Sequence, residues 1–401
     1  MNDAFFMRLA LRLARRGSGA TSPNPMVGAV LVKDGKIIGR GWHRRAGLPH
    51  AEIEALRDAQ KRGHNPRSAT LFVTLEPCCT HGRTPPCTDA IIAAGIEKVV
   101  IGATDPNPKH AGKGFEILKR TGIGVDRWSE RPHKPKNNSK NGSSGASPRQ
   151  KIAGECAILN AAFNHWIVHR TPFVTVKAAM TLDGKTATAS GESKWITGEN
   201  ARARGMKLRQ SSDAILVGIN TILADDPSLT ARKQKADGRW LMGKPILRII
   251  LDSMARTPLT AQVVNDELAK LTAVVVSKNA PKIRAAALAK KVTVVVAPLK
   301  KSQIANRKSQ IDLSWLLKKL GAENVTSLLV EGGGEVNSSF LLGGMAQRVA
   351  FFYAPKILGG RDSHKGVAGE GVKNLSAAIR LHEVEWRKLG PDLLLTGLVA
   401  S

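Results

Sequence analysis

The first third of the chain alternates short apolar runs with polar turns. Residues 29–32 read Ala-Val-Leu-Val, and residues 37–39 read Ile-Ile-Gly after a Lys33-Asp34-Gly35-Lys36 turn, which predicts a β-hairpin. Apolar side chains at helical spacing predict a first helix over 1–16. The other predicted elements are a helix over 50–62, a strand over 69–75, a helix through 89–94 and a strand over 99–102.

The pattern stops at a polar stretch and then resumes as a second unit. Residues 134–150 hold no side chain that could anchor a core, so we predict a flexible insertion over about 128–151. A connecting helix over 155–166 follows. We therefore expect a first domain over 1–170, including the insertion and this helix, and a second domain over 171–401.

The second unit has apolar strand candidates alternating with helices, which predicts a mostly parallel sheet covered on both faces. The predicted strands are 173–178, 214–217, 246–251, 273–276, 292–296 and 327–330, and the predicted helices include 200–210 and 313–320. The fold class is therefore α/β in both halves.

The net charge of +29 raises nucleic acid as a partner. The excess is spread over the chain, however, as +9 in 1–127, +5 in 128–151 and +15 in 152–401, and aromatic residues make up only 4%. This distribution favours a basic surface for phosphorylated small molecules over specific nucleic-acid binding. No apolar run is long enough for a membrane span, and the sparse cysteines indicate a reducing compartment, so we expect a cytoplasmic protein.

Three of the four cysteines lie in one short segment, downstream of a His-Ala-Glu tripeptide. His50 with Cys78 and Cys87 gives one imidazole and two thiolates, which can hold zinc and leave its fourth position open to water. Glu52 would then move protons as the catalytic residue of a hydrolytic deaminase. A structural zinc site would need a fourth ligand, and Cys79 or His81 could replace Cys78. We favour Cys78, because a cysteine after Pro77 at a helix start would have its thiolate stabilised by the helix dipole.

A second site is indicated where the strand over 327–330 breaks into glycines. Glu331 is followed by Gly332-Gly333-Gly334 and a predicted helix, an arrangement that lets a backbone approach a phosphate closely. Many α/β proteins have such a turn without a ligand. Two further stretches, 177–195 and 221–227, place polar groups at the ends of neighbouring strands and favour a ligand site at this end of the sheet.

These motifs together resemble the bifunctional riboflavin biosynthesis enzymes, in which a pyrimidine deaminase is fused to a reductase. The resemblance covers nearly the whole chain apart from 128–151. The segments that carry it are 23–28 (Pro-Asn-Pro-Met-Val-Gly), His50-Ala51-Glu52, 74–78 (Thr-Leu-Glu-Pro-Cys), 82–87 (Gly-Arg-Thr-Pro-Pro-Cys) and 105–108 (Asp-Pro-Asn-Pro). Eight residues separate Cys78 from Cys87, whereas other zinc deaminases usually separate their cysteines by two.

The resemblance implies a cytidine-deaminase-like α/β/α domain followed by a dihydrofolate-reductase-like α/β domain, with Zn²⁺ and NADPH as cofactors. In the deaminase, Asn24, Arg83 and Asn107 would contact substrate, with Arg83 suited to its phosphate. In the reductase, the implied NADPH contacts are Ala179, Trp195, Thr221, Asp225, Ser253, Gly333, Gly334, Glu335, Val336, Asn337, Ser338 and Ser339. The implied substrate contacts there are Ser193, Arg209, Leu229, Arg232 and Glu331, with the two arginines nearest the phosphate.

Two positions depart from the family pattern. Many members carry a histidine where this chain has Thr80, with His81 one step later, and a glycine where it has Ala179. An enzyme with only one active domain therefore stays open as an alternative. The basic charge leaves two others open, a nucleic-acid base deaminase that uses the basic surface and a non-enzymatic basic binding module. The expected partners are a phosphorylated pyrimidine and further copies of the chain in a homo-oligomer.

Overall fold

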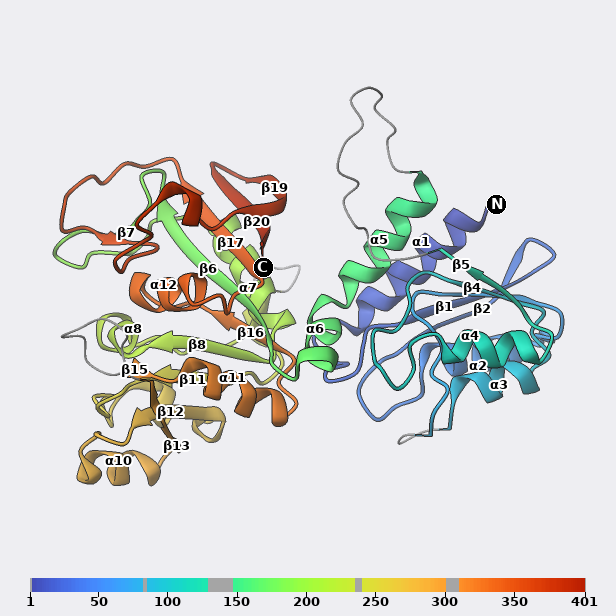
Figure 1. Cartoon of the computed structure of the whole chain (residues 1–401), viewed down its shortest axis with the longest axis horizontal. Coiled ribbons are helices and arrows are strands. Elements are labelled where there is room, and N and C mark those ends of the chain that lie inside the picture. Colours follow the sequence, from blue (N-terminus) through green and yellow to red (C-terminus); the bar gives the residue numbers. More distant parts are fainter. Residues whose placement is uncertain (1, 82–84, 129–146, 235–239, 301–309, 401) are drawn as a thin grey trace. The chain divides into compact units, whose positions relative to one another are not determined.

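The computed structural model describes residues 2–81, 85–128, 147–234, 240–300 and 310–400. Its contacts divide the chain into two compact units, Met1–His169 and Arg170–Ser401. Each unit is built on its own β-sheet with helices on both faces (Figure 1).

The first unit has a five-stranded sheet in the order β2-β1-β3-β4-β5. The strands are β1 (Gly28–Lys33), β2 (Lys36–Trp42), β3 (Thr70–Val73), β4 (Lys98–Ile101) and β5 (Gly124–Arg127), and the helices are α1 (Asp3–Ala14), α2 (Ala51–Lys61), α3 (Cys87–Ala93), α4 (Lys113–Arg120), α5 (Pro148–Leu159) and α6 (Ala161–His169). Strands β1 and β2 form the predicted hairpin, since Lys33 pairs with Lys36 across Asp34-Gly35. Strands β3, β4 and β5 run parallel.

Alternation along the strands produces the two layers of this unit. Leu31 and Leu71 pack on the side of α2, α3 and α4, while Val30 and Phe72 pack on the side of α1 and α5. Helix α2 approaches the hairpin very closely, because a Cβ at Gly41 would lie 2.2 Å from the carbonyl oxygen of Ala51. Glycine there lets the first turn of α2, with its functional residues, lie directly on the sheet.

The structure corrects the predicted insertion and connecting helix. Trp128 is buried in the core of the first unit, and Ser147 caps α5 with Gln150 in a capping box, so 128 and 147–151 are ordered parts of the fold. Residues 129–146 lie outside the described ranges. The single helix predicted over 155–166 is two helices that meet at Asn160, whose side-chain amide makes two hydrogen bonds to the backbone of Met26.

The second unit has a nine-stranded sheet in the order β13-β12-β11-β8-β16-β6-β17-β20-β19. The strands of this unit, some of which form separate two-stranded sheets, are β6 (Phe173–Thr181), β7 (Lys185–Ala187), β8 (Ala214–Gly218), β9 (Arg232–Gln234), β10 (Trp240–Met242), β11 (Leu247–Leu251), β12 (Thr272–Ser277), β13 (Thr293–Ala297), β14 (Leu299–Lys300), β15 (Gln310–Ile311), β16 (Ser327–Val330), β17 (Arg348–Ala354), β18 (His364–Lys365), β19 (Leu381–Leu389) and β20 (Asp392–Val399). Its helices are α7 (Glu199–Ser211), α8 (Ile219–Asp225), α9 (Gln262–Asn265), α10 (Lys282–Ala289), α11 (Leu313–Ala322) and α12 (Gly334–Leu342).

In the nine-stranded sheet, the neighbouring strands β13, β12, β11, β8, β16, β6 and β17 are parallel. Strands β20 and β19 add an antiparallel end to this sheet. All six strands predicted for this half are present. Within β8, Ile215 and Val217 pack in the layer of α8, α9 and α10, whereas Leu216 packs in the layer of α11 and α12. The prediction of a mostly parallel sheet with helices on both faces is therefore confirmed. Within the described ranges, no helix has the length and apolar character needed to cross a membrane.

Candidate zinc centre and cofactor site

The first turn of α2 carries the His-Ala-Glu motif. His50 is the N-cap residue in an extended conformation, and Glu52 lies on the buried face of the helix together with Ala51, Ala55 and Ala59. The Glu52 side chain is 3% exposed, and its Oε2 has no hydrogen-bond partner in the part of the chain that the structure describes. A buried carboxylate oxygen without a partner is costly, which indicates that a ligand or water completes this site.

The two cysteines come from different kinds of backbone. Cys78 lies in the loop after β3, so the prediction that it begins a helix is wrong; the cysteine at a helix start is Cys87, which follows Pro86 and opens α3. The Cys87 N–H donates to the Cys78 sulfur at 3.4 Å. The prediction failed because Pro77-Cys78 and Pro86-Cys87 have the same local pattern, and sequence alone does not say which proline starts the helix.

His50, Cys78 and Cys87 form a compact cluster. His50 Nδ1 lies 3.5 Å from Cys78 Sγ and 3.3 Å from Cys87 Sγ, and the ligand atoms of the three residues lie within 4.8 Å of one another. Cys79 instead faces His110, with its Sγ 3.7 Å from His110 Nδ1, and His81 is exposed. One imidazole and two thiols with no fourth protein ligand among the described residues are the donor set of a catalytic zinc site, so the residues present fit zinc.

Burial and hydrogen bonding prepare these groups for their chemistry. Burial raises the pKa of Glu52 to about 7, which places proton uptake and release near neutral pH. The hydrogen bond with Cys87, aided by His50, lowers the pKa of Cys78 to about 4, while the same contact with Cys78 raises the pKa of Cys87. The contact between the two sulfurs therefore favours the thiolate form of Cys78, and a bound cation would favour that of Cys87 as well.

A histidine that the sequence did not reveal lies beside the cluster. The His43 ring packs edge-on against His50, with 5.2 Å between ring centroids. Its Nδ1 lies 3.1 Å from the Pro49 carbonyl oxygen, and its Nε2 lies 3.2 Å from Asn24 Nδ2. Donation from Nδ1 to the carbonyl leaves Nε2 to accept from Asn24. Asn24 is thereby placed near the metal cluster, although no motif singled out His43.

Asn107 lies in the loop that follows β4 in the first unit. The Asp105 carboxylate accepts the Asn107 N–H at 2.8 Å, and Asn107 Oδ1 accepts the Lys109 N–H at 3.1 Å. These contacts leave the Asn107 side-chain amide group as a donor. Arg83, the residue expected to contact the phosphate, falls in 82–84, outside the described residues.

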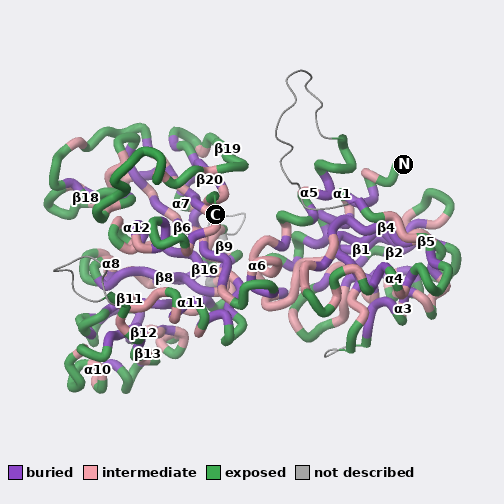
Figure 2. The backbone as a smooth tube through the Cα atoms, viewed as in Figure 1, coloured by how far each residue is buried: buried purple, intermediate pink, exposed green. Residues whose placement is uncertain are grey.

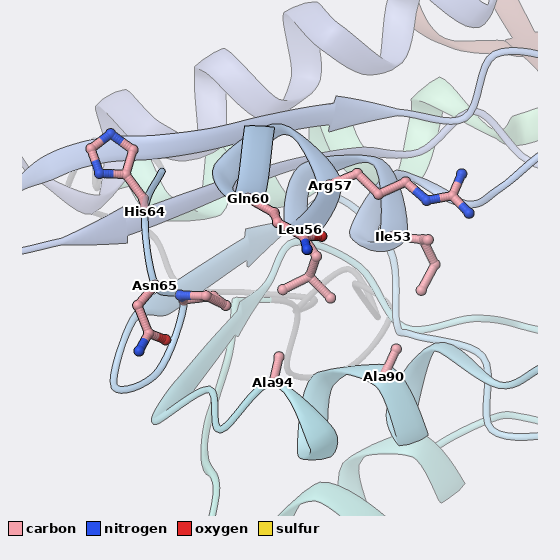
Figure 3. Close-up of a pocket in the computed structure, with 9 residues that line it drawn as sticks. Ile53, Leu56, Arg57, Gln60, His64, Asn65, Ala90 and Ala94 are labelled. Carbon is pink, nitrogen blue, oxygen red and sulfur yellow. The ribbon is translucent and has the colours of Figure 1, made fainter. Parts of the chain in front are cut away.

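A groove on the outer side of α2 is distinct from this cluster. It has a volume of about 420 Å³, and Ile53 and Leu56 of α2 point across it toward Ala90 of α3 and Ala94 just after that helix (Figure 3). Its α2 residues lie on a different face of that helix from Glu52. None of the residues predicted to act in catalysis lines this groove.

In the second unit, two helices begin at the carboxyl ends of neighbouring parallel strands. Gly218 is the N-cap of α8 after β8, and Gly333 is the N-cap of α12 after β16. A Cβ at Gly332 would lie 2.5 Å from Val336, and one at Gly334 would lie 2.3 Å from the Lys365 carbonyl oxygen, whereas one at Gly333 would meet nothing within 4 Å. This glycine turn is a cradle with space above it, which fits the phosphates of a dinucleotide.

A part-buried ion pair lies next to this cradle. Arg209 of α7 donates from Nε and Nη2 to the Glu331 carboxylate at 2.9 and 2.8 Å, and Lys177 Nζ of β6 lies 3.6 Å from Glu331 Oε2. Burial acts to raise the pKa of Glu331, but the charges of Arg209 and Lys177 lower it to about 2. Lys177 begins the polar stretch that the sequence indicated, but its pairing with Glu331 was not predicted.

The other predicted reductase residues lie around the same end of the sheet. The Ser193 hydroxyl lies 3.5 Å from Asp225 Oδ1, and the exposed Trp195 ring stacks with Arg202 at 4.6 Å. The Leu229 side chain is buried in the hydrophobic core, which leaves only its backbone for the predicted substrate contact. The remaining positions are Ala179 in β6, Thr221 in α8, Ser253 after β11, Arg232 at the start of β9, and Glu335, Val336, Asn337, Ser338 and Ser339 in α12.

Comparisons with known proteins identify both halves. Residues 1–103 match the family model of the cytidine and deoxycytidylate deaminase zinc-binding region, and residues 172–395 match that of the RibD C-terminal domain. The riboflavin biosynthesis protein RibD of Actinobacillus pleuropneumoniae is 40% identical over 100% of this chain and 96% of its own length. The chain belongs to the RibD family. It is a bifunctional enzyme of riboflavin biosynthesis, with a zinc-dependent deaminase domain and an NADPH-dependent reductase domain.

Solved structures of the RibD family have the same fold. Acinetobacter baumannii RibD, form 1, superposes with a TM-score of 0.79 at 32% identity and covers 100% of this chain and 99% of that one. The Thermotoga maritima diaminohydroxyphosphoribosylaminopyrimidine deaminase/5-amino-6-(5-phosphoribosylamino)uracil reductase has a TM-score of 0.76 at 35% identity, covering 99% and 98% of the two chains. The predicted combination of a cytidine-deaminase-like and a dihydrofolate-reductase-like domain is thereby confirmed.

Proposed function

We propose that the chain catalyses two consecutive steps on one phosphorylated pyrimidine. The first deaminates 2,5-diamino-6-ribosylamino-4(3H)-pyrimidinone 5′-phosphate by hydrolysis, and the second reduces the ribosyl group to give 5-amino-6-ribitylamino-uracil 5′-phosphate. The observation that carries the proposal is the three-ligand cluster of His50, Cys78 and Cys87 beside the buried Glu52, whose Oε2 has no hydrogen-bond partner among the described residues. The names printed for the full-length relatives support the substrate class.

In the deaminase, His50, Cys78 and Cys87 would hold zinc, which supplies the Lewis acidity that makes water a nucleophile near neutral pH. Glu52 would take one proton from the attacking water and pass it to the ring nitrogen of the pyrimidinone. It would then move the second proton of that water to the amino group, which leaves as ammonia. A pKa of about 7 suits a group that must both accept and release a proton.

Other residues would hold the pyrimidine over Glu52. Asn24, oriented by His43, and the free amide group of Asn107 would donate hydrogen bonds to the ring. Arg83 would bind the 5′-phosphate, because a guanidinium makes two parallel hydrogen bonds to a phosphate.

In the reductase, NADPH would supply the hydride that reduces C1 of the opened ribosyl group. The cofactor contacts we propose are Ala179, Trp195, Thr221, Asp225, Ser253, Gly333, Gly334, Glu335, Val336, Asn337, Ser338 and Ser339. Ser193, Arg232 and the backbone of Leu229 would hold the substrate together with the Arg209–Glu331 pair. Arg209 and the exposed Arg232 would lie nearest the substrate phosphate, with Arg209 oriented by its hydrogen bonds to Glu331 and to the Thr230 carbonyl oxygen.

The boundaries we propose for the two activities are 1–170 for deamination and 171–401 for reduction. The four cysteines are free thiols, which supports a reducing compartment such as the cytoplasm.

The glycine cradle makes a direct test of the cofactor assignment possible. Changing Gly333 to Val should raise the Kd for NADPH at least tenfold, about 1.4 kcal/mol, because the new side chain fills the space above the cradle without meeting protein atoms. The Tm should stay unchanged. Gly154→Val in α5 is the matched control, since a Cβ there also meets nothing within 4 Å. Equal NADPH affinities in the two variants, measured by calorimetry, would place the cofactor elsewhere.

We also propose that the chain forms a homo-oligomer through β19. This outer strand is exposed along seven consecutive residues, and Trp386 on it is 59% exposed (Figure 2). A long exposed edge strand with a large apolar side chain is a template for pairing with a second copy. Trp386→Arg should therefore shift the mass measured by light scattering toward the monomer, whereas Leu375→Arg, at a leucine that is 91% exposed, should not. An unchanged mass for Trp386→Arg argues against this interface.

The substrate class can be tested by product release. Zinc-loaded protein should release ammonia from the pyrimidine ribotide and none from cytidine- or adenosine-containing oligonucleotides. Deamination of the oligonucleotides would favour the nucleic-acid deaminase alternative that the basic surface raised.

A further inference from the structure

The loop that carries Asn107 is held in place by two buried carboxylates. Glu76 accepts the N–H groups of Asp105, Gly112 and Gly114 at 3.2, 3.1 and 3.0 Å, and Asp105 accepts that of Asn107. Four charge-assisted hydrogen bonds fix the backbone of 105–114 against the strand that leads to Cys78. The loop therefore does not depend on its outward side chains for its shape.

His110 is an outward side chain of this loop that faces the metal-ligand segment. Its Nε2 lies 3.5 Å from the Thr80 hydroxyl, and its Nδ1 lies 3.7 Å from Cys79 Sγ. Both contacts are at the long end of the hydrogen-bonding range, so a better acceptor could replace them. His110 is half-buried, and its backbone N–H is bonded to the Asn107 carbonyl oxygen, which places the imidazole beside a predicted substrate contact.

The charges around His110 favour an anion. Lys109 and Lys113 are exposed near His110 in sequence, and the Thr80 hydroxyl lies next to the His110 ring. Of the neighbouring carboxylates, Asp105 interacts electrostatically with His110. Both Glu76 and Asp105 are buried, however, and their oxygens accept backbone N–H groups, so neither is exposed at the surface. The rim is therefore cationic and rich in hydrogen-bond donors, which is the chemistry that recognises a phosphate monoester.

We propose that His110, with Thr80, binds the phosphate of the deaminase substrate and so determines its preference for a phosphorylated pyrimidine riboside. His81, the imidazole adjacent to Thr80 in sequence, is exposed and makes no such contribution. This inference rests on the proposed function, since it concerns the substrate of the same site.

The test compares two substrates that differ only in the phosphate. Initial rates of ammonia release are measured on the ribotide and on the same riboside after phosphatase treatment, for zinc-loaded wild type, His110→Ala, His110→Lys and His81→Ala. His110→Ala should lose roughly tenfold to a hundredfold in kcat/KM on the ribotide and nothing on the riboside. His110→Lys should recover most of the loss, because an ammonium also binds phosphate. His81→Ala and the remote His64→Gln should match wild type on both substrates.

The outcomes separate this inference from the proposed function. An equal loss on both substrates for His110→Ala would mean that His110 only positions the Cys78 segment, and it would overturn the proposal, as would no loss at all or a loss in His81→Ala instead. Zinc content and Tm of each variant exclude a folding defect. Wild-type protein that releases ammonia from neither substrate would contradict the proposed function itself.

Discussion

Changing Glu52 to Gln is expected to reduce ammonia release by roughly 10²–10⁴-fold while zinc stays bound. Glutamine has the same shape and fills the same buried position, but it cannot take a proton from water or return one to the leaving amine. The three ligand residues are untouched by the change, and so are the residues of the second unit. Zinc content by mass spectrometry and NADPH oxidation on the deaminated intermediate should therefore equal those of wild type.

Glu54→Gln is the matched control for this experiment. Glu54 lies two residues further along the same helix and pairs with Arg44 and Arg57 at the surface, where an ion pair contributes about 1 kcal/mol or less. Its turnover should stay near that of wild type. Near-normal ammonia release by Glu52→Gln would show that another group moves the proton.

The second large effect is a difference in zinc binding between variants of two adjacent cysteines, Cys78 and Cys79. Cys78→Ala should lose zinc and, with it, all measurable deamination, because two remaining protein ligands hold zinc poorly. Cys79→Ala should retain both, since the Cys79 thiol faces His110 and lies outside the cluster. Zinc per chain after dialysis against a weak chelator measures the difference directly.

The reductase serves as the internal control for these cysteine variants. Its activity on the deaminated intermediate should be the same in Cys78→Ala, Cys79→Ala and wild type, because the two units have separate cores. Zinc retention by Cys78→Ala together with zinc loss by Cys79→Ala would reverse the ligand assignment.

Most of the fold could be predicted because its cores follow simple periodicities. Strands such as β8 and β12 are unbroken apolar runs bounded by polar turns, and α7 and α11 have the predicted bounds to within two residues. The Asn160 break between α5 and α6 could not be predicted, because its cause is a pair of hydrogen bonds to Met26, 134 residues away. A tertiary contact of this kind leaves no local signal in the sequence.

The candidate site shows the same division. His50, Glu52, Cys78 and Cys87 could be chosen from residue type and spacing, since zinc chemistry restricts both. His43 could not, because it becomes functional only through Asn24, which is distant in sequence. Lys177 begins a stretch that the sequence did indicate, but its pairing with the distant Glu331 could not be predicted. The helix start was assigned to the wrong cysteine for a related reason: two Pro-Cys pairs look alike until the loop between them is placed.

The central claim is that one chain performs two ordered reactions, and a single time course tests it most directly. Zinc-loaded protein is given the diaminopyrimidine ribotide and NADPH, and ammonia release and NADPH oxidation are followed separately in the same sample. We predict that ammonia appears first, that NADPH oxidation follows after a lag with the same final amount, and that Glu52→Gln abolishes both until the deaminated intermediate is added. NADPH oxidation that precedes ammonia release, or that proceeds unchanged in Glu52→Gln on the ribotide, would contradict the account.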